Sequence, residues 1–171
     1  MRRPACLSLT SLAVLAGLAL VACGGHPPCP ADPTRAEGGA TGADADDPAP
    51  VLRVVEQWRQ GYEVRSVDAL AAVYLDSKNL TVVDQGAATR GWDAVRAGLT
   101  ERLGRAKQVY LRLTETAVDL RAGTAIVVGK LTREVSDGVT SVSEAGTLTL
   151  TLIGQGADWR IVAEHFSYGA R

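Results

Sequence analysis

The stretch DWRIVAEHFS at residues 158–167 is the most informative segment of the chain for its fold. It is rich in β-branched and aromatic residues, as strands are, and it follows residues 147–152, where leucine alternates with threonine. Before these, residues 124–135 form a β-branched run that leads to Asp137-Gly138, a typical hairpin turn. Three long strands in succession predict an antiparallel sheet at the end of the chain.

A fourth long strand is predicted over residues 109–120, with an irregularity inside it. Its apolar residues occupy odd positions up to Leu113 and even positions from Val118 onward. Because side-chain direction in a strand alternates with a period of two, this change of phase predicts a bulge or a bend.

Helices precede these strands. Apolar residues at helical spacing predict a first helix whose buried face comprises Val51, Val54, Val55, Trp58 and Tyr62. Ser66 is a suitable cap for a second, shorter helix, and a third helix is predicted from Trp92 to Leu103, with a short strand at residues 80–85 before it. Helices first and strands last predict an α+β fold, in which a bent antiparallel sheet is covered on one face.

The amino terminus has the layout of a targeting signal. Arg2 and Arg3 precede an uncharged apolar run, which ends in Ala22-Cys23 within a sequence that resembles the bacterial lipobox. The resemblance implies that residues 1–22 are a lipoprotein signal peptide. It also implies that Cys23 carries lipid, including acyl chains such as palmitate, that holds the protein on a membrane. The alternatives are an ordinary signal peptide cut near Ala22 and an uncleaved anchor.

Residues 23–50 are predicted to be the acylated cysteine with a disordered tether, and residues 51–171 a folded domain. All seven prolines lie at or before Pro50, six of them in residues 23–50, whereas the three Trp, four Tyr and one Phe all lie in residues 51–171. A segment rich in Pro, Gly and Asp cannot bury enough apolar surface to offset its ordering entropy. Once Cys6 leaves with the signal and Cys23 is acylated, Cys29 is the remaining thiol, either unused or able to link two chains.

Charge and composition limit the function. The chain has 18 Lys and Arg against 19 Asp and Glu, so it lacks the basic excess of a nucleic-acid binder. The predicted domain contains one histidine, His165, and no cysteine, so we expect neither a metal site nor a thiol nucleophile there. No cofactor is indicated.

Several short motifs, in this order, resemble the nuclear transport factor 2-like (NTF2-like) superfamily and, within it, the SnoaL-like branch of polyketide-cyclase relatives. They are the Trp58/Tyr62 helix, Tyr74-Leu75-Asp76, Arg90-Gly91-Trp92 and the closing stretch that begins at Asp158. The resemblance implies an NTF2-like, or cystatin-like, cone: N-terminal helices packed in a strongly curved antiparallel sheet of about four to six strands. Members include enzymes, small-ligand binders and dimerisation domains, so the resemblance leaves the function open.

Alternation along the last strand suggests which residues face the pocket of such a cone. It places His165 and Ser167 on the face of Trp159 and Ile161, which begins in the core, and Glu164 on the opposite face. The expected ligand-binding residues are therefore Trp58, Tyr62, Tyr74, Trp92, His165 and Ser167. The alternatives are that the aromatic residues belong to the core and that His165 is a core histidine bonded to a neighbour.

His165 and Asp84 are the candidate catalytic residues. Asp84 shares a strand face with Leu80 and Val82, and a carboxyl group buried beside aromatic rings would have a raised pKa and could act as a general base. The alternative is that Asp84 caps the turn that follows it.

The steroid isomerases of the superfamily offer a test of catalysis. On alignment, their oxyanion tyrosine falls on Trp58, their basic aspartate on Val83, and their protonated aspartic acid near Thr147 or Thr149. Valine and threonine cannot replace two carboxyl groups, so isomerase chemistry of that kind is not expected.

These observations favour a lipid-anchored protein of the bacterial cell envelope, on its periplasmic or extracellular face, that binds a small, mostly apolar ligand without catalysis. One alternative is a dehydratase, cyclase or isomerase that uses His165 with Asp84 or Glu115. The other is a module whose threonine-rich sheet face makes a homodimer or docks a partner.

Overall fold

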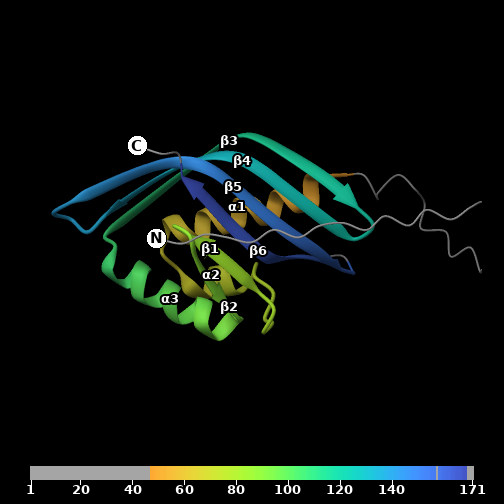
Figure 1. Cartoon of the computed structure of the whole chain (residues 1–171), viewed down its shortest axis with the longest axis horizontal. Coiled ribbons are helices and arrows are strands. Elements are labelled where there is room, and N and C mark those ends of the chain that lie inside the picture. The colour runs from red at the N-terminus through yellow and green to blue at the C-terminus, as the bar shows by residue number, and fades with distance from the viewer. Residues whose placement is uncertain (1–46, 157, 169–171) are drawn as a thin grey trace, which may run out of the picture. The chain divides into compact units, whose positions relative to one another are not determined.

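The computed structural model describes residues 47–156 and 158–168, and Figure 1 shows their arrangement. The helices lie on one side of a curved six-stranded sheet, with α1 against its inner face, so the predicted α+β fold is confirmed. The elements are α1 (Ala49–Glu63), α2 (Val67–Ala71), β1 (Thr81–Asp84), β2 (Ala87–Arg90), α3 (Trp92–Arg105), β3 (Gln108–Arg121), β4 (Thr124–Ser136), β5 (Ser141–Gln155) and β6 (Asp158–Tyr168). The predicted signal peptide, Cys23, Cys29 and most of the tether lie outside the described residues.

The first two helices follow the predicted pattern. The apolar stripe of α1 is buried: Val51, Val54, Val55, Trp58 and Tyr62. Ser66 caps α2, because its hydroxyl accepts the Ala69 N–H at 3.1 Å. The helix α1 begins at Ala49, slightly before the expected boundary, since Asp47 Oδ1 accepts the Ala49 N–H at 2.9 Å and Pro50 fits the first turn.

The sheet has the strand order β2-β1-β6-β5-β4-β3. Its pairs are antiparallel except β1 with β6, which is parallel, so the expectation of a wholly antiparallel sheet was wrong at one pair. The strand β2 was also not expected. It forms because Gln85 (φ 52°) and Gly86 (φ 79°) adopt the two positive φ values of a tight hairpin turn.

The irregularity predicted in the strand after α3 is confirmed. The register of β3 against β4 shifts between Thr114 and Ala117, and Glu115 has a φ of 51°. The bulge lets the apolar residues on both sides of the shift face the helices.

A second bulge, in β6, was not predicted. Ile161 pairs with Leu152 and Ala163 pairs with Thr151, so Val162 is an extra residue opposite a continuous partner strand. Beyond it, every side chain turns to the face opposite the one expected from simple alternation. Glu164 and Phe166 are consequently buried on the inner face, where Tyr168 also lies half-buried, whereas His165 and Ser167 are exposed on the outer face.

Candidate functional site

A cavity of about 430 Å³ opens at the end of the sheet near the β4–β5 turn, between that sheet and the last turns of α3. Its apolar walls are Leu103, Ala106, Val109, Val135 and Val142. Its polar lining comprises Tyr62, Asp84, Gln85, Arg102, Arg105, Arg133, Asp137 and Glu144. An apolar cavity with a few converging polar groups is the usual composition of a small-molecule site.

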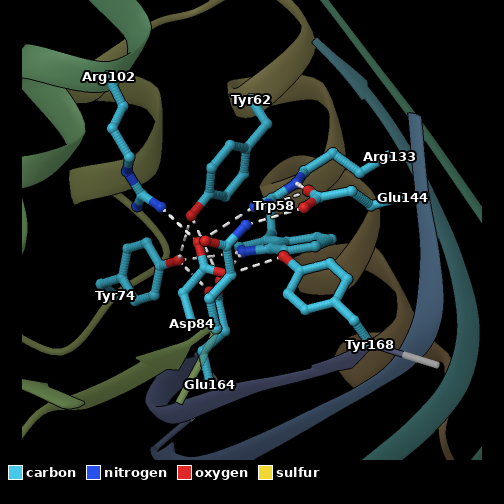
Figure 2. Close-up of polar contacts among 10 residues, drawn as sticks. Trp58, Tyr62, Tyr74, Asp84, Arg102, Arg133, Glu144, Glu164 and Tyr168 are labelled. Atoms are coloured by element: carbon cyan, nitrogen blue, oxygen red, sulfur yellow. Dashed lines mark hydrogen bonds and ion pairs between the residues drawn. The ribbon is translucent and has the colours of Figure 1, made fainter. Parts of the chain in front are cut away.

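Asp84 lies at the centre of a group of charged side chains in the cavity. Its Oδ2 accepts hydrogen bonds from Arg102 Nη1 at 2.7 Å and Arg133 Nη1 at 3.2 Å, and its Oδ1 accepts one from the Tyr168 hydroxyl at 2.6 Å. Arg133 is also paired with Glu144, at 2.6 Å. Figure 2 shows these side chains converging from β1, α3, β4, β5 and β6.

The hydrogen bonds and ion pairs of Asp84 lower the pKa of its carboxyl group. Partial burial by itself raises the pKa of the carboxyl group, but the hydrogen bond from Tyr168 and the charge of Arg133 outweigh it, and the pKa lies below its ordinary value. Asp84 is therefore a charged carboxylate at neutral pH. The expectation of a raised pKa was wrong, and so was the alternative of a simple turn cap, since the carboxylate bonds across three other elements.

A second polar cluster lies behind the cavity wall, around Glu164, whose side chain is buried. Its Oε2 accepts hydrogen bonds from Trp58 Nε1, at 2.9 Å, and from the Tyr74 hydroxyl, and its Oε1 accepts one from the Tyr62 hydroxyl at 3.3 Å. Figure 2 shows the three aromatic side chains pointing at this carboxyl group. Tyr62 belongs to both the cluster and the cavity lining.

The pKa of Glu164 is shifted in the opposite direction from that of Asp84, because burial outweighs hydrogen bonding at Glu164. Burial raises the pKa of Glu164, although the hydrogen bonds from Tyr74 and Trp58 oppose it. Burial and the nearby Glu164 carboxyl also raise the pKa values of Tyr62 and Tyr74, so both phenols keep their protons. Two carboxyl groups near one cavity are thus pushed apart in pKa.

Of the six residues predicted to bind a ligand, Tyr62 lines the described cavity. Of the other three aromatic residues, Trp58 and Tyr74 lie behind it, and Trp92 packs on Tyr74 in the core, with ring centroids 5.7 Å apart. His165 and Ser167 were expected to face the pocket, and this was wrong. The Val162 bulge places both on the outer face of the sheet.

The candidate catalytic residues are likewise divided. Asp84 lies in the cavity, whereas His165 does not, and Glu115 is exposed in the β3 bulge, where it pairs with Lys130 at 2.7 Å. His165 therefore cannot act with either acid in this cavity. Trp58 does donate its indole N–H, but to Glu164, which the comparison with steroid isomerases did not indicate.

Sequence analysis missed the residues that the fold brings together here: Arg102, Arg133, Glu144, Glu164 and Tyr168. An acid between apolar neighbours in a strand, as in Val162-Ala163-Glu164, is a weak signal of a buried carboxyl group. It could not be used without knowing where the bulge falls.

A smaller cavity of about 350 Å³ adjoins the first, between α3 and the β1–β2 hairpin. The two share Asp84, Arg102 and Arg105, so the Asp84–Arg102 ion pair lies between them. Within residues 47–156 and 158–168, no three His, Asp or Glu side chains gather as a metal site would need.

Comparison with known proteins agrees with this architecture. The model of the SnoaL-like domain family matches residues 51–171. The chain belongs to the SnoaL-like family. No curated protein sequence matches it significantly.

Solved structures share the fold at low sequence identity. A proposed dehydratase of the NTF2-like family from Streptomyces avermitilis is 16% identical, with 72% of this chain and 96% of that one covered and a TM-score of 0.67. A proposed scytalone dehydratase from Novosphingobium aromaticivorans is 13% identical, covering 71% and 83%, with a TM-score of 0.63. An uncharacterised protein with a cystatin-like fold from Caulobacter vibrioides is 18% identical, covering 71% and 89%, with a TM-score of 0.62.

Proposed function

We propose that this SnoaL-like domain binds a small, mostly apolar molecule in the cavity of about 430 Å³. The observation that carries the proposal is the composition of the cavity, with valine, leucine and alanine walls around a charged inner end. Burying such a ligand removes apolar surface from water, at about 25 cal/mol per Å², and supplies most of the affinity.

The charges at the inner end support a ligand without net charge. Asp84 and Glu144 already neutralise Arg102 and Arg133 through ion pairs of 2.6–3.2 Å. A charged ligand would have to displace one of these partners and leave a charge unpaired, which is costly in a half-buried site. A neutral molecule with one or two polar atoms avoids that cost.

Thermal unfolding in the presence of small neutral aromatic and alicyclic compounds tests the proposal. A ligand at 100 times its Kd stabilises the folded protein by about 2.7 kcal/mol, which raises Tm by several degrees. Val142→Trp should abolish the shift by filling the cavity mouth. Val139→Trp is the matched control, because Val139 is 92% exposed in the adjoining turn and does not line the described cavity. Equal shifts in both variants would refute this location.

We also propose that the domain is held on the bacterial cell envelope by lipid on Cys23. The support is the amino-terminal sequence. Among the described helices, none combines the length and apolar character needed to cross a bilayer. Cys23→Ala should abolish acylation and release the protein from the membrane fraction, and a mature amino terminus at another residue would refute the assignment.

A second candidate function is acid–base catalysis of the dehydratase type in the same cavity. The specific observation in its favour is the pair of carboxyl groups with opposite pKa shifts: the pKa of Asp84, at the cavity, is lowered, and that of Glu164, behind it, is raised by burial. Such a pair suits the removal of one proton and the delivery of another. Dehydration of β-hydroxy ketones, followed by enone absorbance, should slow about 100-fold or more in Asp84→Asn, but not in Glu115→Gln. An unchanged rate in Asp84→Asn would remove this candidate.

A homodimer through the sheet is a separate proposal, supported by the outer face. Ile126 and Val128 are about 40% exposed there, and they pair in register with Thr151 and Thr149. Sedimentation should give a dimer that Val128→Asp dissociates, and a monomeric parent protein would refute it.

A further inference from the structure

The hydrogen bonds around Glu164 can be counted for each of its two protonation states. When the carboxyl group is ionised it only accepts, so Trp58, Tyr74 and Tyr62 all donate to it and the cluster is closed. The Tyr62 proton then points at a charged acceptor 3.3 Å away, and a bond to a charged group is about twice as strong as one to a neutral group. In this state the Tyr62 hydroxyl donates to Glu164 and not into the cavity.

The directions change when Glu164 is neutral. Its own proton then donates to the Tyr74 oxygen, its closest partner, and the Tyr74 proton is left to donate to the Tyr62 oxygen at 3.3 Å. The Tyr62 proton now has, within the described cluster, only the uncharged Glu164 Oε1, also at 3.3 Å. That distance is well beyond the usual 2.7–2.8 Å of an O–H···O bond.

We propose that the Tyr62 hydroxyl is the hydrogen-bond donor for an uncharged oxygen acceptor of the ligand, such as a carbonyl, and that it donates into the cavity when Glu164 holds a proton. The inference rests on the proposed binding function and names the chemical class of the ligand. Tyr62 suits this role because it is the member of the cluster that lines the described cavity. A carbonyl oxygen there replaces the long bond to Oε1 with one of normal length.

Other charged groups face the cluster from the elements packed around it. Arg102 comes from α3, Arg133 from β4, Glu144 from β5 and Asp84 from β1. They are paired with one another by ion pairs of 2.6–3.2 Å, so their charges largely cancel at Glu164. Arg102 favours the ionised form of Glu164, but burial outweighs it. The group that changes charge between the two states is therefore Glu164.

The first test compares two probes of the same shape on the full-length protein in detergent: the bicyclic ketone 1-tetralone and the hydrocarbon tetralin. At pH 4.5, where a carboxyl group of raised pKa is mostly protonated, the wild type should bind the ketone about two- to tenfold more tightly than tetralin, the worth of one neutral hydrogen bond. Tyr62→Phe should abolish this preference and leave tetralin binding unchanged. Tyr110→Phe is the control, because Tyr110 is exposed on the outer face. A preference that survives in Tyr62→Phe overturns the inference.

The second test uses pH. The ketone preference should shrink as pH rises and Glu164 ionises, since Tyr62 is then recaptured by the carboxylate. Glu164→Gln should keep the preference at every pH, because the Gln amide N–H₂ donates to Tyr74 as the neutral acid does. A preference with the same pH dependence in Glu164→Gln overturns the role of Glu164.

A measurement without ligand separates this inference from the proposed function. The infrared C=O stretch of a neutral carboxylic acid should be present in the unliganded protein and absent in Glu164→Gln, and it should fade over the pH range in which the ketone preference fades. If the band is absent at pH 4.5, the inference is overturned even where both probes bind. If the band is present and neither probe binds, the proposed function is overturned, and with it the role given to Tyr62.

Discussion

Replacement of Glu164 by Gln should remove a pH dependence from the stability of the whole domain. Glu164 is 1% exposed, and burial raises its pKa above the ordinary value of 4.5. The folded protein therefore binds this proton more tightly than the unfolded chain does. The stabilisation is fully present below pH 4.5 and is lost as pH rises from there through the folded-state pKa.

The magnitude follows from the linkage of one proton. Over that interval the wild type should lose up to about 1.4 kcal/mol of unfolding free energy for each pH unit, relative to Glu164→Gln. At low pH the two proteins should be of similar stability, because Gln matches the neutral acid in size and its N–H₂ donates to Tyr74, while the Trp58 N–H keeps the Tyr74 oxygen as an acceptor at 3.0 Å. At pH 7 the variant should be the more stable protein.

Urea unfolding followed by tryptophan fluorescence from pH 4.5 to 8 measures the difference. Glu134→Gln is the matched control, because Glu134 is exposed on the outer side of β4 and its replacement should leave the pH profile unchanged. A constant difference between wild type and Glu164→Gln across this range would show that the buried carboxyl group has no raised pKa. If the assay is extended down to pH 3, a wild type that gains on the variant as pH rises toward 4.5 would show that the three donors outweigh burial, because the pKa of Glu164 would then lie below 4.5.

Three further predictions concern other positions. Asp84→Asn should destabilise the protein by about 1–3 kcal/mol at pH 7, by urea unfolding, because Arg102, Arg133 and Tyr168 lose their charged partner; since the pKa of Asp84 is lowered, this cost should be present above about pH 3.9 and fade as pH falls through the folded-state value. His165→Gln should change stability by less than about 0.5 kcal/mol, because the side chain is exposed, and a larger loss in the same assay would contradict its placement on the outer face. Gly98→Ala should stabilise α3 by up to about 1 kcal/mol, since an added Cβ there meets no described atom within 4 Å. Gly146→Ala should instead prevent normal folding, because its Cβ would overlap the Ser167 carbonyl. Equal Tm values for the two variants would refute this reasoning.

Local features of the sequence were sufficient for the helices and for much of the sheet. A period of 3.6 identified the buried face of α1, and Ser66 identified the start of α2. The change of phase between Leu113 and Val118 located the β3 bulge, because apolar residues on both sides of it must face the same core. These features depend on the order of residues along one segment, so they can be read without a partner.

The site could be predicted only in part for the same reason. Tyr62 lies on the predicted face of α1 and Asp84 on the predicted face of β1, and both side chains line the cavity. The guanidinium groups of Arg102 and Arg133 come from elements far from Asp84 in the chain, and Glu144 lies opposite Arg133 in the β4–β5 hairpin. Their ion pairs around Asp84 depend on the curvature of the sheet and the packing of α3, which no local pattern records.

The largest difference between sequence and structure depends on one residue, Val162. The sequence by itself determined that residues 158–168 form a strand with two alternating faces. Tertiary structure decided which face is inside: pairing of Ile161 with Leu152 and of Ala163 with Thr151 leaves Val162 as the extra residue. Because side-chain direction has a period of two, that single unpaired residue moves Glu164 into the core and His165 to the surface. A bulge is a property of two strands together, so the sequence of one strand cannot place it.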